Sequence, residues 1–311
     1  MRKELTYKSK DNITEIHATI WVPTTGIKGI VQFSHGMIEY KDRYEEFASH
    51  LNNQGFLVCA NDHLGHGDSI VDKEHLGYFA AKNSADILVE DTYSLTKLVK
   101  EEYPNIPYFV LGHSFGSFVV RNYIQKYSNE IDGVILSGTT HRSRIQMLYA
   151  KLIASIISIY KGGPFYRSKF LEKATTGSFS SYFKSDIKLC WLTKDYKFLE
   201  EYGKDPKCRF KFTVNAYQTM FTLLKNANNN TKNMRKDLPI LLISGKDDPV
   251  SDFGKDIVTL NNFYKKKKFT NVKYKTYNGL RHLIFNEPEK VIVLNDLVQY
   301  LNMNLINKKE N

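Results

Sequence analysis

Cysteine is scarce in this chain of 311 residues, which contains Cys59, Cys190, Cys208 and no others. The number is odd, the spacing is wide and no CxxC pair occurs, so the sequence indicates neither a disulfide framework nor a zinc site built on paired cysteines. This usage is typical of a reducing compartment.

Long apolar segments are also missing. No run approaches the roughly 20 apolar residues that a membrane-spanning helix needs. The first twelve residues, MRKELTYKSKDN, lack the apolar segment of a signal peptide. We therefore expect a cytoplasmic protein, with any membrane contact being peripheral.

Charge is not balanced, because 44 Lys and Arg face 33 Asp and Glu, a formal charge of +11. Basic proteins often bind nucleic acids or anionic membranes. Most of the lysines are scattered, the dense run Lys265 to Lys268 fits a solvated connection, and no nucleic-acid-binding motif accompanies the charge. We expect no nucleic-acid partner, whereas attraction to acidic lipid surfaces stays open.

The apolar content of 42% supplies a core, and its patterning alternates between strands and helices. Strand patterns cover 13–22, 28–34, 56–61, 107–112, 132–138, 238–244 and 272–277, and the clearest helical patterns cover 42–54, 84–102, 114–127 and 287–305. Such alternation predicts an α/β fold with a mostly parallel, twisted sheet covered by helices on both faces. The first two strand patterns look like an antiparallel start.

The alternation breaks between about 141 and 236, where no clear strand pattern occurs. We interpret 141–236 as a helical lid inserted into a core formed by 1–140 and 237–311. An insertion of this kind lets the later strands return to complete the same sheet.

The strongest local motif is Gly112-His113-Ser114-Phe115-Gly116, which matches the G-x-S-x-G nucleophile elbow. It follows the apolar strand pattern YFVLG and opens a helical pattern, which is the setting that the motif requires. The alternative is an ordinary glycine-containing turn. In this setting Ser114 is the candidate nucleophile.

A serine hydroxyl needs a base, and in this fold an acid and then a histidine follow the serine in the chain. His141 leaves too little room for an intervening acid, so His282, after the last strand pattern, is the candidate base. Asp248 in SGKDDPV is the preferred acid. Asp247 is the alternative, and Asp252 fits better as a cap of the next helix.

An oxyanion hole would complete this machinery with backbone N–H groups. The elbow supplies Phe115, and the loop after strand pattern 28–34 supplies Met37. The nearby segment 62–68, DHLGHGD, contains metal-ligating residue types, but its spacing matches no zinc-protease motif and its glycines favour a turn. We expect neither a metal nor a cofactor.

Together these residues resemble the monoglyceride lipase and lysophospholipase-like branch of the α/β-hydrolase superfamily, also described as serine aminopeptidase S33. HGMIEYKDRY, NDHLGHGDS, GHSFGS, SGKDDPV and YNGLRHLIFNE occur in that branch's order and are distributed along most of the chain outside 141–236. The resemblance implies the triad Ser114, Asp248 and His282 with an oxyanion hole at Met37 and Phe115. It departs at Leu64 and Leu283, where relatives commonly carry Arg and Glu.

One segment of the insertion is informative. From 147 to 160, MLYAKLIASIISIY, the polar residues Lys151, Ser155 and Ser158 form a thin stripe on an otherwise apolar helical pattern. This helix could pack on the core, pair with another subunit, line an acyl tunnel or contact a membrane surface. Burial against the core is the ordinary interpretation.

These features predict a serine hydrolase that cleaves carboxylic esters through an acyl-enzyme on Ser114, with monoacylglycerol or lysophospholipid as the small-molecule substrate. A short-chain esterase or an aminopeptidase would use the same triad, and an acyltransferase would replace water with an alcohol. A non-catalytic binding protein that retains the fold is the alternative of another class. The oligomeric state is not predicted.

Overall fold

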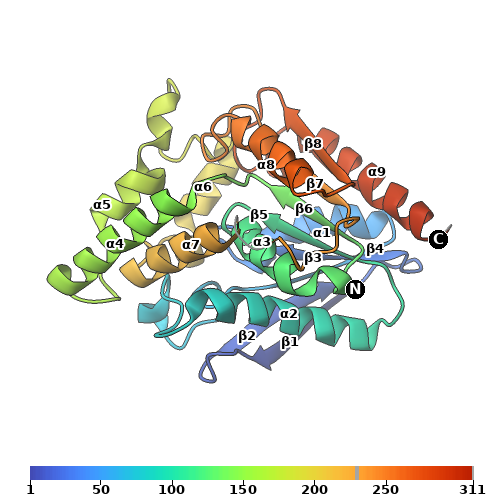
Figure 1. Ribbon diagram of the computed structural model, residues 1–311, viewed down its shortest axis with the longest axis horizontal. Helices are drawn as coiled ribbons and strands as arrows, with labels where there is room; N and C mark the ends of the chain where they lie inside the picture. Colours follow the sequence, from blue (N-terminus) through green and yellow to red (C-terminus); the bar gives the residue numbers. More distant parts are fainter. Residues whose placement is uncertain (228–230, 310–311) are drawn as a thin grey trace.

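The computed structural model describes residues 1–227 and 231–309 and contains, within them, one sheet of eight strands (Figure 1). The strand order is β1-β2-β4-β3-β5-β6-β7-β8. Strands β1 and β2 are antiparallel to their neighbours, and the other six run parallel. The strands are β1 (Arg2–Lys8), β2 (Glu15–Trp21), β3 (Gly29–Ser34), β4 (Phe56–Asn61), β5 (Tyr108–His113), β6 (Gly133–Ser137), β7 (Ile240–Gly245) and β8 (Val272–Tyr277).

Helices cover both faces of this sheet. Residues of α2, α3 and α8 are buried with one set of strand side chains, and residues of α1 and α9 with the opposite set. The α-helices are α1 (Glu45–Asn53), α2 (Ser84–Glu102), α3 (Phe115–Tyr127), α4 (Arg144–Lys161), α5 (Lys169–Glu172), α6 (Tyr196–Lys204), α7 (Val214–Ala227), α8 (Lys255–Lys266) and α9 (Lys290–Lys309). Single-turn helices are η1 (Lys41–Tyr44), η2 (Lys73–His75), η3 (Ser128–Glu130), η4 (Lys173–Gly177), η5 (Phe179–Tyr182) and η6 (Pro206–Cys208).

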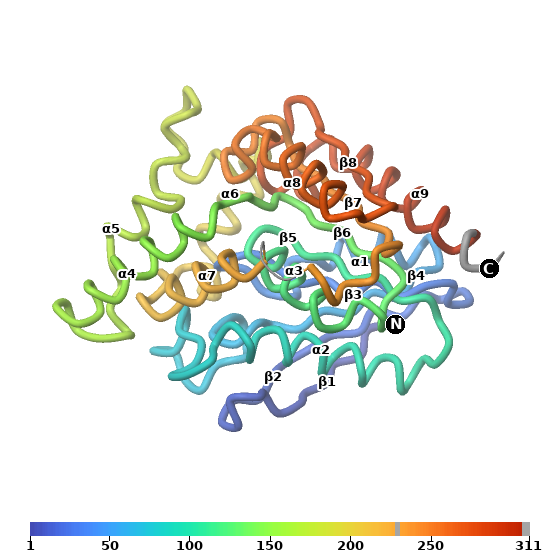
Figure 2. Tube along the Cα trace, in the orientation of Figure 1, coloured from blue at the N-terminus to red at the C-terminus, as the bar shows by residue number. Residues whose placement is uncertain are grey.

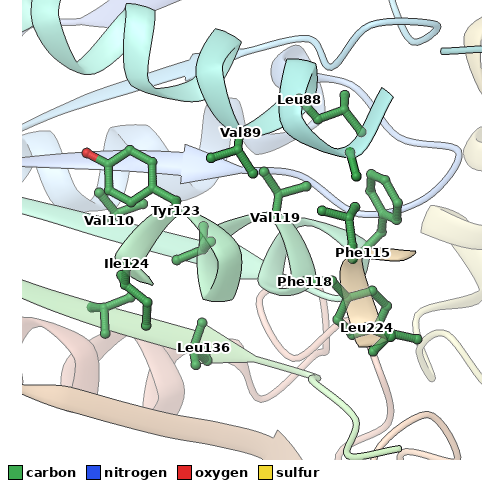
Figure 3. Close-up of a cluster of buried hydrophobic side chains, with 14 of the residues drawn as sticks. Leu88, Val89, Val110, Phe115, Phe118, Val119, Tyr123, Ile124, Leu136 and Leu224 are labelled. Carbon is green, nitrogen blue, oxygen red and sulfur yellow. The ribbon is translucent and has the colours of Figure 1, made fainter. Parts of the chain in front are cut away.

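The core around α3 explains why the central strands are apolar on both sides. Val110 of β5, Leu136 of β6, Val119 and Ile124 of α3 and Leu88 of α2 belong to one buried cluster (Figure 3). Alternate residues such as Leu111 point to the other face, toward α1 and α9. Burying such side chains from water is the main stabilisation of the fold.

The helices α4 to α7 lie between β6 and β7 in the chain. Figure 2 shows the chain leaving the sheet after β6 and returning at β7. Helix α4 packs against α7, and α7 packs in turn on α2 and α3, so these helices stand at one end of the molecule (Figure 1). Residues 228–230 of the expected insertion and 310–311 of the second core segment lie outside the described residues.

The α/β-hydrolase type of fold is confirmed, with two corrections to its start. The strand patterns at 13–22 and 28–34 do not pair, because β3 lies between β4 and β5 in the parallel part. The antiparallel start is instead β1 with β2, and β1 was missed. Its sequence RKELTYK has five exposed or partly exposed polar residues and belongs to an edge strand.

Candidate active site

Ser114 occupies the sharp turn between β5 and α3, with a backbone φ of 51°. Glycine is required on both sides of it. A β-carbon on Gly116 would stand 2.0 Å from the carbonyl oxygen of Ser34, and one on Gly112 would stand 2.6 Å from the carbonyl oxygen of Gly116. This packing of α3 against the sheet holds the serine in a strained conformation that a looser turn would relax.

The structure brings Ser114, His282 and Asp248 into one hydrogen-bonded chain. The Ser114 hydroxyl donates to Nε2 of His282 at 2.8 Å, and Nδ1–H of His282 donates to Oδ1 of Asp248 at 2.9 Å. His282 is 2% exposed and Asp248 is fully buried. Because the carboxylate accepts at Nδ1, the imidazole presents a free electron pair to the serine proton.

Asp248 is held in place by its own partners. Its Oδ2 accepts from the hydroxyl of Ser244, and its Oδ1 also accepts from the N–H of Val250. Asp247 is half-buried, and its N–H donates to the carbonyl of Leu280, whereas the carboxylate that His282 Nδ1 contacts is that of Asp248.

The interpretation of Asp252 as a helix cap is wrong. Helix α8 begins after Gly254, whose φ of 82° marks the cap position, and no side chain caps it. Asp252 lies two residues earlier with a φ of 48° and forms an ion pair with Lys255 at 3.4 Å.

Two backbone N–H groups lie close to the serine and are free to bind an anion. Phe115 is the first residue of α3, where an N–H has no partner within the helix. The N–H of Met37 donates to no other group of residues 1–227 and 231–309. Both residues line the same cavity as Ser114.

Three buried histidines support the loop that contains Met37. Nδ1–H of His35 donates to the carbonyl of Gly36 at 2.8 Å, and Nε2 of His35 accepts from the N–H of His63. Nε2 of His66 accepts from the N–H of Ile38 at 3.3 Å. Burial lowers the pKa of His63 to about 3 and that of His66 to about 4, so both rings are neutral at physiological pH.

The segment 62–68 forms a turn whose acidic and histidine residues bind protein groups. Asp62 accepts from the N–H groups of Lys41 and Asp68, and a β-carbon on Gly67 would stand 2.1 Å from its Oδ2. The histidines of this segment were considered as metal ligands, but their contribution to the Met37 loop was missed. Their position directly after β4, beside the end of β3, is the signal that could have found it.

Glu39 is a further buried group that sequence reasoning missed. Its Oε2 accepts from the N–H of Gly36 at 2.9 Å and from the hydroxyl of Tyr44 at 2.7 Å. A β-carbon on Gly36 would stand 2.5 Å from that oxygen and 3.3 Å from the β-carbon of Ser114, so the carboxyl lies beside Ser114. Burial raises the pKa of Glu39.

A cavity of about 760 Å³ opens at Ser114 and continues between α4 and α7. Its volume is within the range of small-molecule sites. Its lining includes polar groups such as Glu39 and Tyr202. Most of its lining is apolar and includes Phe118, Met147, Ala150, Ile153, Phe170, Leu171, Met220, Phe221 and Leu224.

Comparison with known proteins shows the family that this chain matches and the proteins to which it is similar. The family model described as serine aminopeptidase, S33, matches residues 25–289. The monoacylglycerol lipase of Mycolicibacterium smegmatis is 25% identical over 283 residues, which cover 91% of each protein. The monoglyceride lipase of Saccharomyces cerevisiae is 28% identical over 300 residues, covering 89% of this chain and 86% of the yeast protein. A carboxyl esterase from Bacillus coagulans, solved in complex with glycerol, has a TM-score of 0.89 at 26% identity, covering 98% of this chain and 99% of the esterase.

Proposed function

Because this chain belongs to the serine aminopeptidase S33 family and is, by its relatives, a carboxylic ester hydrolase, we propose that Ser114, His282 and Asp248 are its catalytic triad. We further propose that its substrates are fatty acyl esters of glycerol or of a lysophospholipid. The observation that carries this proposal is the hydrogen-bonded chain from Ser114 to Asp248 at the mouth of a largely apolar cavity.

The mechanism follows from these positions. The Ser114 oxygen attacks the acyl carbonyl carbon while Nε2 of His282 takes its proton, and Asp248 stabilises the imidazolium that forms. The N–H groups of Met37 and Phe115 bind the negative charge that develops on the carbonyl oxygen. The imidazolium then protonates the departing alcohol, and His282 activates a water molecule that releases the acid from Ser114.

The apolar lining favours a long acyl chain. Each buried methylene contributes about 0.8 kcal/mol, and the cavity between α4 and α7 offers an apolar path for such a chain. We interpret 141–236 as a lid, because α4 and α7 form the walls of this path.

Hydrolysis of a panel of esters by wild type and by Ser114→Ala tests the proposal. The panel contains p-nitrophenyl esters from acetyl to palmitoyl, monoacylglycerols, a lysophospholipid and an aminoacyl anilide. We expect turnover of medium and long acyl esters, and a loss of about 10⁴-fold or more in Ser114→Ala. Preference for acetyl esters would contradict the lipid assignment, and absence of Ser114-dependent turnover would favour a binding protein.

An aminopeptidase is the second candidate, favoured by Glu39. A free N-terminal amine needs an acidic partner near the nucleophile, and the Glu39 carboxyl lies beside Ser114. Burial raises the pKa of this carboxyl, and its Oε2 already accepts from the N–H of Gly36 and the hydroxyl of Tyr44, which weakens its attraction for an ammonium group. Cleavage of the anilide in preference to the esters would establish this function instead.

We also propose that α4 contacts a lipid surface. The expectation that this helix buries its apolar face on the core is wrong for much of that face, because Ile145, Leu148, Tyr149, Leu152, Ile153, Ile156, Ile159 and Tyr160 are all exposed. The polar stripe points inward instead, where Ser155 accepts a hydrogen bond from Gln218 of α7. A helix with this orientation presents apolar side chains to whatever lies outside.

The charge distribution favours an anionic surface. Residues 141–236 contain 19 Lys and Arg but 6 Asp and Glu, a formal charge of +13, whereas the rest of the chain sums to −2. Exposed lysines of this segment include Lys161, the last residue of α4, and Lys169 and Lys173, which follow it in the chain. No helix of residues 1–227 and 231–309 is long and apolar enough to cross a membrane. The exposed apolar side chains of α4 and the positive charge of 141–236 lead us to propose contact at the membrane surface, and we propose a cytoplasmic location for the protein.

Cosedimentation with vesicles tests this contact. We expect wild type to bind vesicles of phosphatidylcholine with phosphatidylglycerol more tightly than phosphatidylcholine alone, and Ile156→Asp to lose most of that binding. Val258→Asp is the matched control, because Val258 is exposed to a similar degree on α8. Equal binding by wild type and Ile156→Asp would overturn the assignment of this surface.

A further inference from the structure

Ile38 is the most unusual residue of the loop beside Ser114. Its φ of 60° lies in the left-handed region, which a β-branched side chain rarely adopts and which costs about 1–2 kcal/mol. Both of its backbone polar groups are held from outside the loop. Its N–H donates to Nε2 of His66 at 3.3 Å, and its carbonyl accepts from the hydroxyl of Tyr202 at 2.9 Å.

The neighbouring peptide groups are held as well. The N–H of Gly36 donates to Glu39, and the carbonyl of Gly36 accepts from His35. Of the N–H groups from Gly36 to Ile38, the one on Met37 is left without an acceptor among the described residues. The surrounding groups therefore determine the direction of this N–H, and a strained residue sits directly after it.

Tyr202 differs from the other groups that hold the loop, because it belongs to α6, within the inserted segment. It lies 164 residues from Ile38 in the chain and is 6% exposed. Its ring packs near the guanidinium of Arg43, 4.8 Å from the ring centre, and beside Phe198. A second contact joins the same region to the loop, since the Tyr40 hydroxyl donates to Asp205 directly after α6.

We propose that Tyr202 is a positioning residue for ester hydrolysis: its hydroxyl holds the strained Ile38 so that the N–H of Met37 points at the developing oxyanion. The inserted segment thereby completes the catalytic centre as well as lining the cavity. This inference rests on the proposed function, specifically on the role of the Met37 N–H.

The physical reason is that an oxyanion hole acts by preorganisation. Donors that are already aimed stabilise the transition state without reorganising during the reaction. Without the Tyr202 hydroxyl, the left-handed conformation of Ile38 loses one of its two restraints and the loop can relax toward ordinary backbone angles. Substrate binding depends mainly on the apolar cavity, so the loss should appear in kcat rather than in KM.

Steady-state kinetics of Tyr202→Phe test this proposal, because the change removes the hydroxyl and keeps the ring. We expect kcat to fall about tenfold with KM within about twofold, since loosening one donor should cost less than the 10²–10³-fold loss on removing one. Tyr40→Phe is the matched control, because it breaks the other contact between the loop and the region of α6 and leaves the carbonyl of Ile38 bonded. Its kcat should stay within about twofold of wild type.

The Ile38→Gly background provides a second test that does not depend on one variant. Glycine adopts a positive φ without the steric cost, so the restraint from Tyr202 matters less there. We expect Tyr202→Phe to lower kcat by less than about threefold in this background, a non-additive pair of changes. Thermal unfolding of each variant shows whether it is folded.

Three results would overturn the inference: an unchanged kcat in Tyr202→Phe, an equal loss in Tyr40→Phe, or a raised KM at constant kcat. An equal loss of kcat with Ile38 and with Gly at position 38 would also contradict it. Ser114→Ala assayed in parallel separates the two levels of the argument, because turnover that does not depend on Ser114 overturns the proposed function itself.

Discussion

Gly138 offers the sharpest test of the geometry around His282. It directly follows β6 and has a φ of 55°. A β-carbon on this residue would stand 2.9 Å from Cε1 and 3.1 Å from Nδ1 of His282, and 3.3 Å from Cε1 of His113. Gly138→Ala therefore keeps Ser114, His282 and Asp248, the three residues of the proposed triad, and crowds the imidazole of His282.

The size of the effect can be worked out from these contacts. Ordinary carbon contacts begin at about 3.5 Å, so the imidazole or the backbone at 138 must move by roughly half an ångström or more. His282 is held between Ser114 and Asp248 by hydrogen bonds of 2.8 and 2.9 Å, and such a shift misaligns both. Misplacement by about 1 Å can lower a rate about 100-fold, which is the loss of kcat/KM that we expect.

The assay is hydrolysis of a p-nitrophenyl ester together with thermal unfolding. Gly163→Ala is the matched control, since Gly163 also has a positive φ, 81°, but no atom lies within 4 Å of its β-carbon position. Both variants should lose about 1–2 kcal/mol from the backbone strain, and only Gly138→Ala should lose activity at a temperature where both are folded. A folded Gly138→Ala protein with wild-type kcat/KM would refute the reasoning.

Two further predictions concern the acid and the histidines. Asp248→Asn should lower kcat about 10⁴-fold because the imidazole is then held in the wrong tautomer. Asp247→Asn should change kcat by less than about threefold. A larger loss in Asp247→Asn than in Asp248→Asn would assign the role of the acid to Asp247. His66 has a pKa of about 4 when folded and about 6.5 when unfolded. The unfolded chain therefore takes up the extra proton as the pH falls below 6.5, so the stability that neutral His66 contributes is complete above that pH and is lost toward pH 4. The difference in free energy of unfolding between wild type and His66→Gln, measured with urea, should shrink by about 2 kcal/mol from pH 7.5 to pH 5. A difference that does not change with pH would contradict the buried, neutral state of this ring.

The central strands and the nucleophile elbow were predictable because their signals are local. Gly112 and Gly116 flank Ser114 within five residues, and the contacts that a β-carbon would make at each glycine explain why the motif has that form. Helix α2 follows its pattern over 84–102 without change. Chain order selected His282 and directed the search for the acid to SGKDDPV, where Asp248 was preferred and Asp247 stayed an alternative. The structure brings Asp248 within hydrogen-bond distance of His282.

The features that were missed depend on contacts between distant segments. Strand β1 has too few apolar residues to be recognised alone, and it exists because its backbone pairs with β2. The placement of β3 between β4 and β5 depends on how the whole sheet assembles. Helix α4 has one apolar pattern, and only its packing on α7 shows that the polar stripe faces inward.

The amino-acid sequence by itself therefore determined the α/β architecture and the residues of the candidate triad, because periodicity and motif spacing reflect steric rules that act over a few residues. The tertiary structure decided which groups surround those residues. Tyr202 reaches the carbonyl of Ile38 across 164 positions, and Gly138, directly after β6, lies close to His282. Such contacts arise from the close packing of segments that share no local pattern, so they become visible only when the chain is folded.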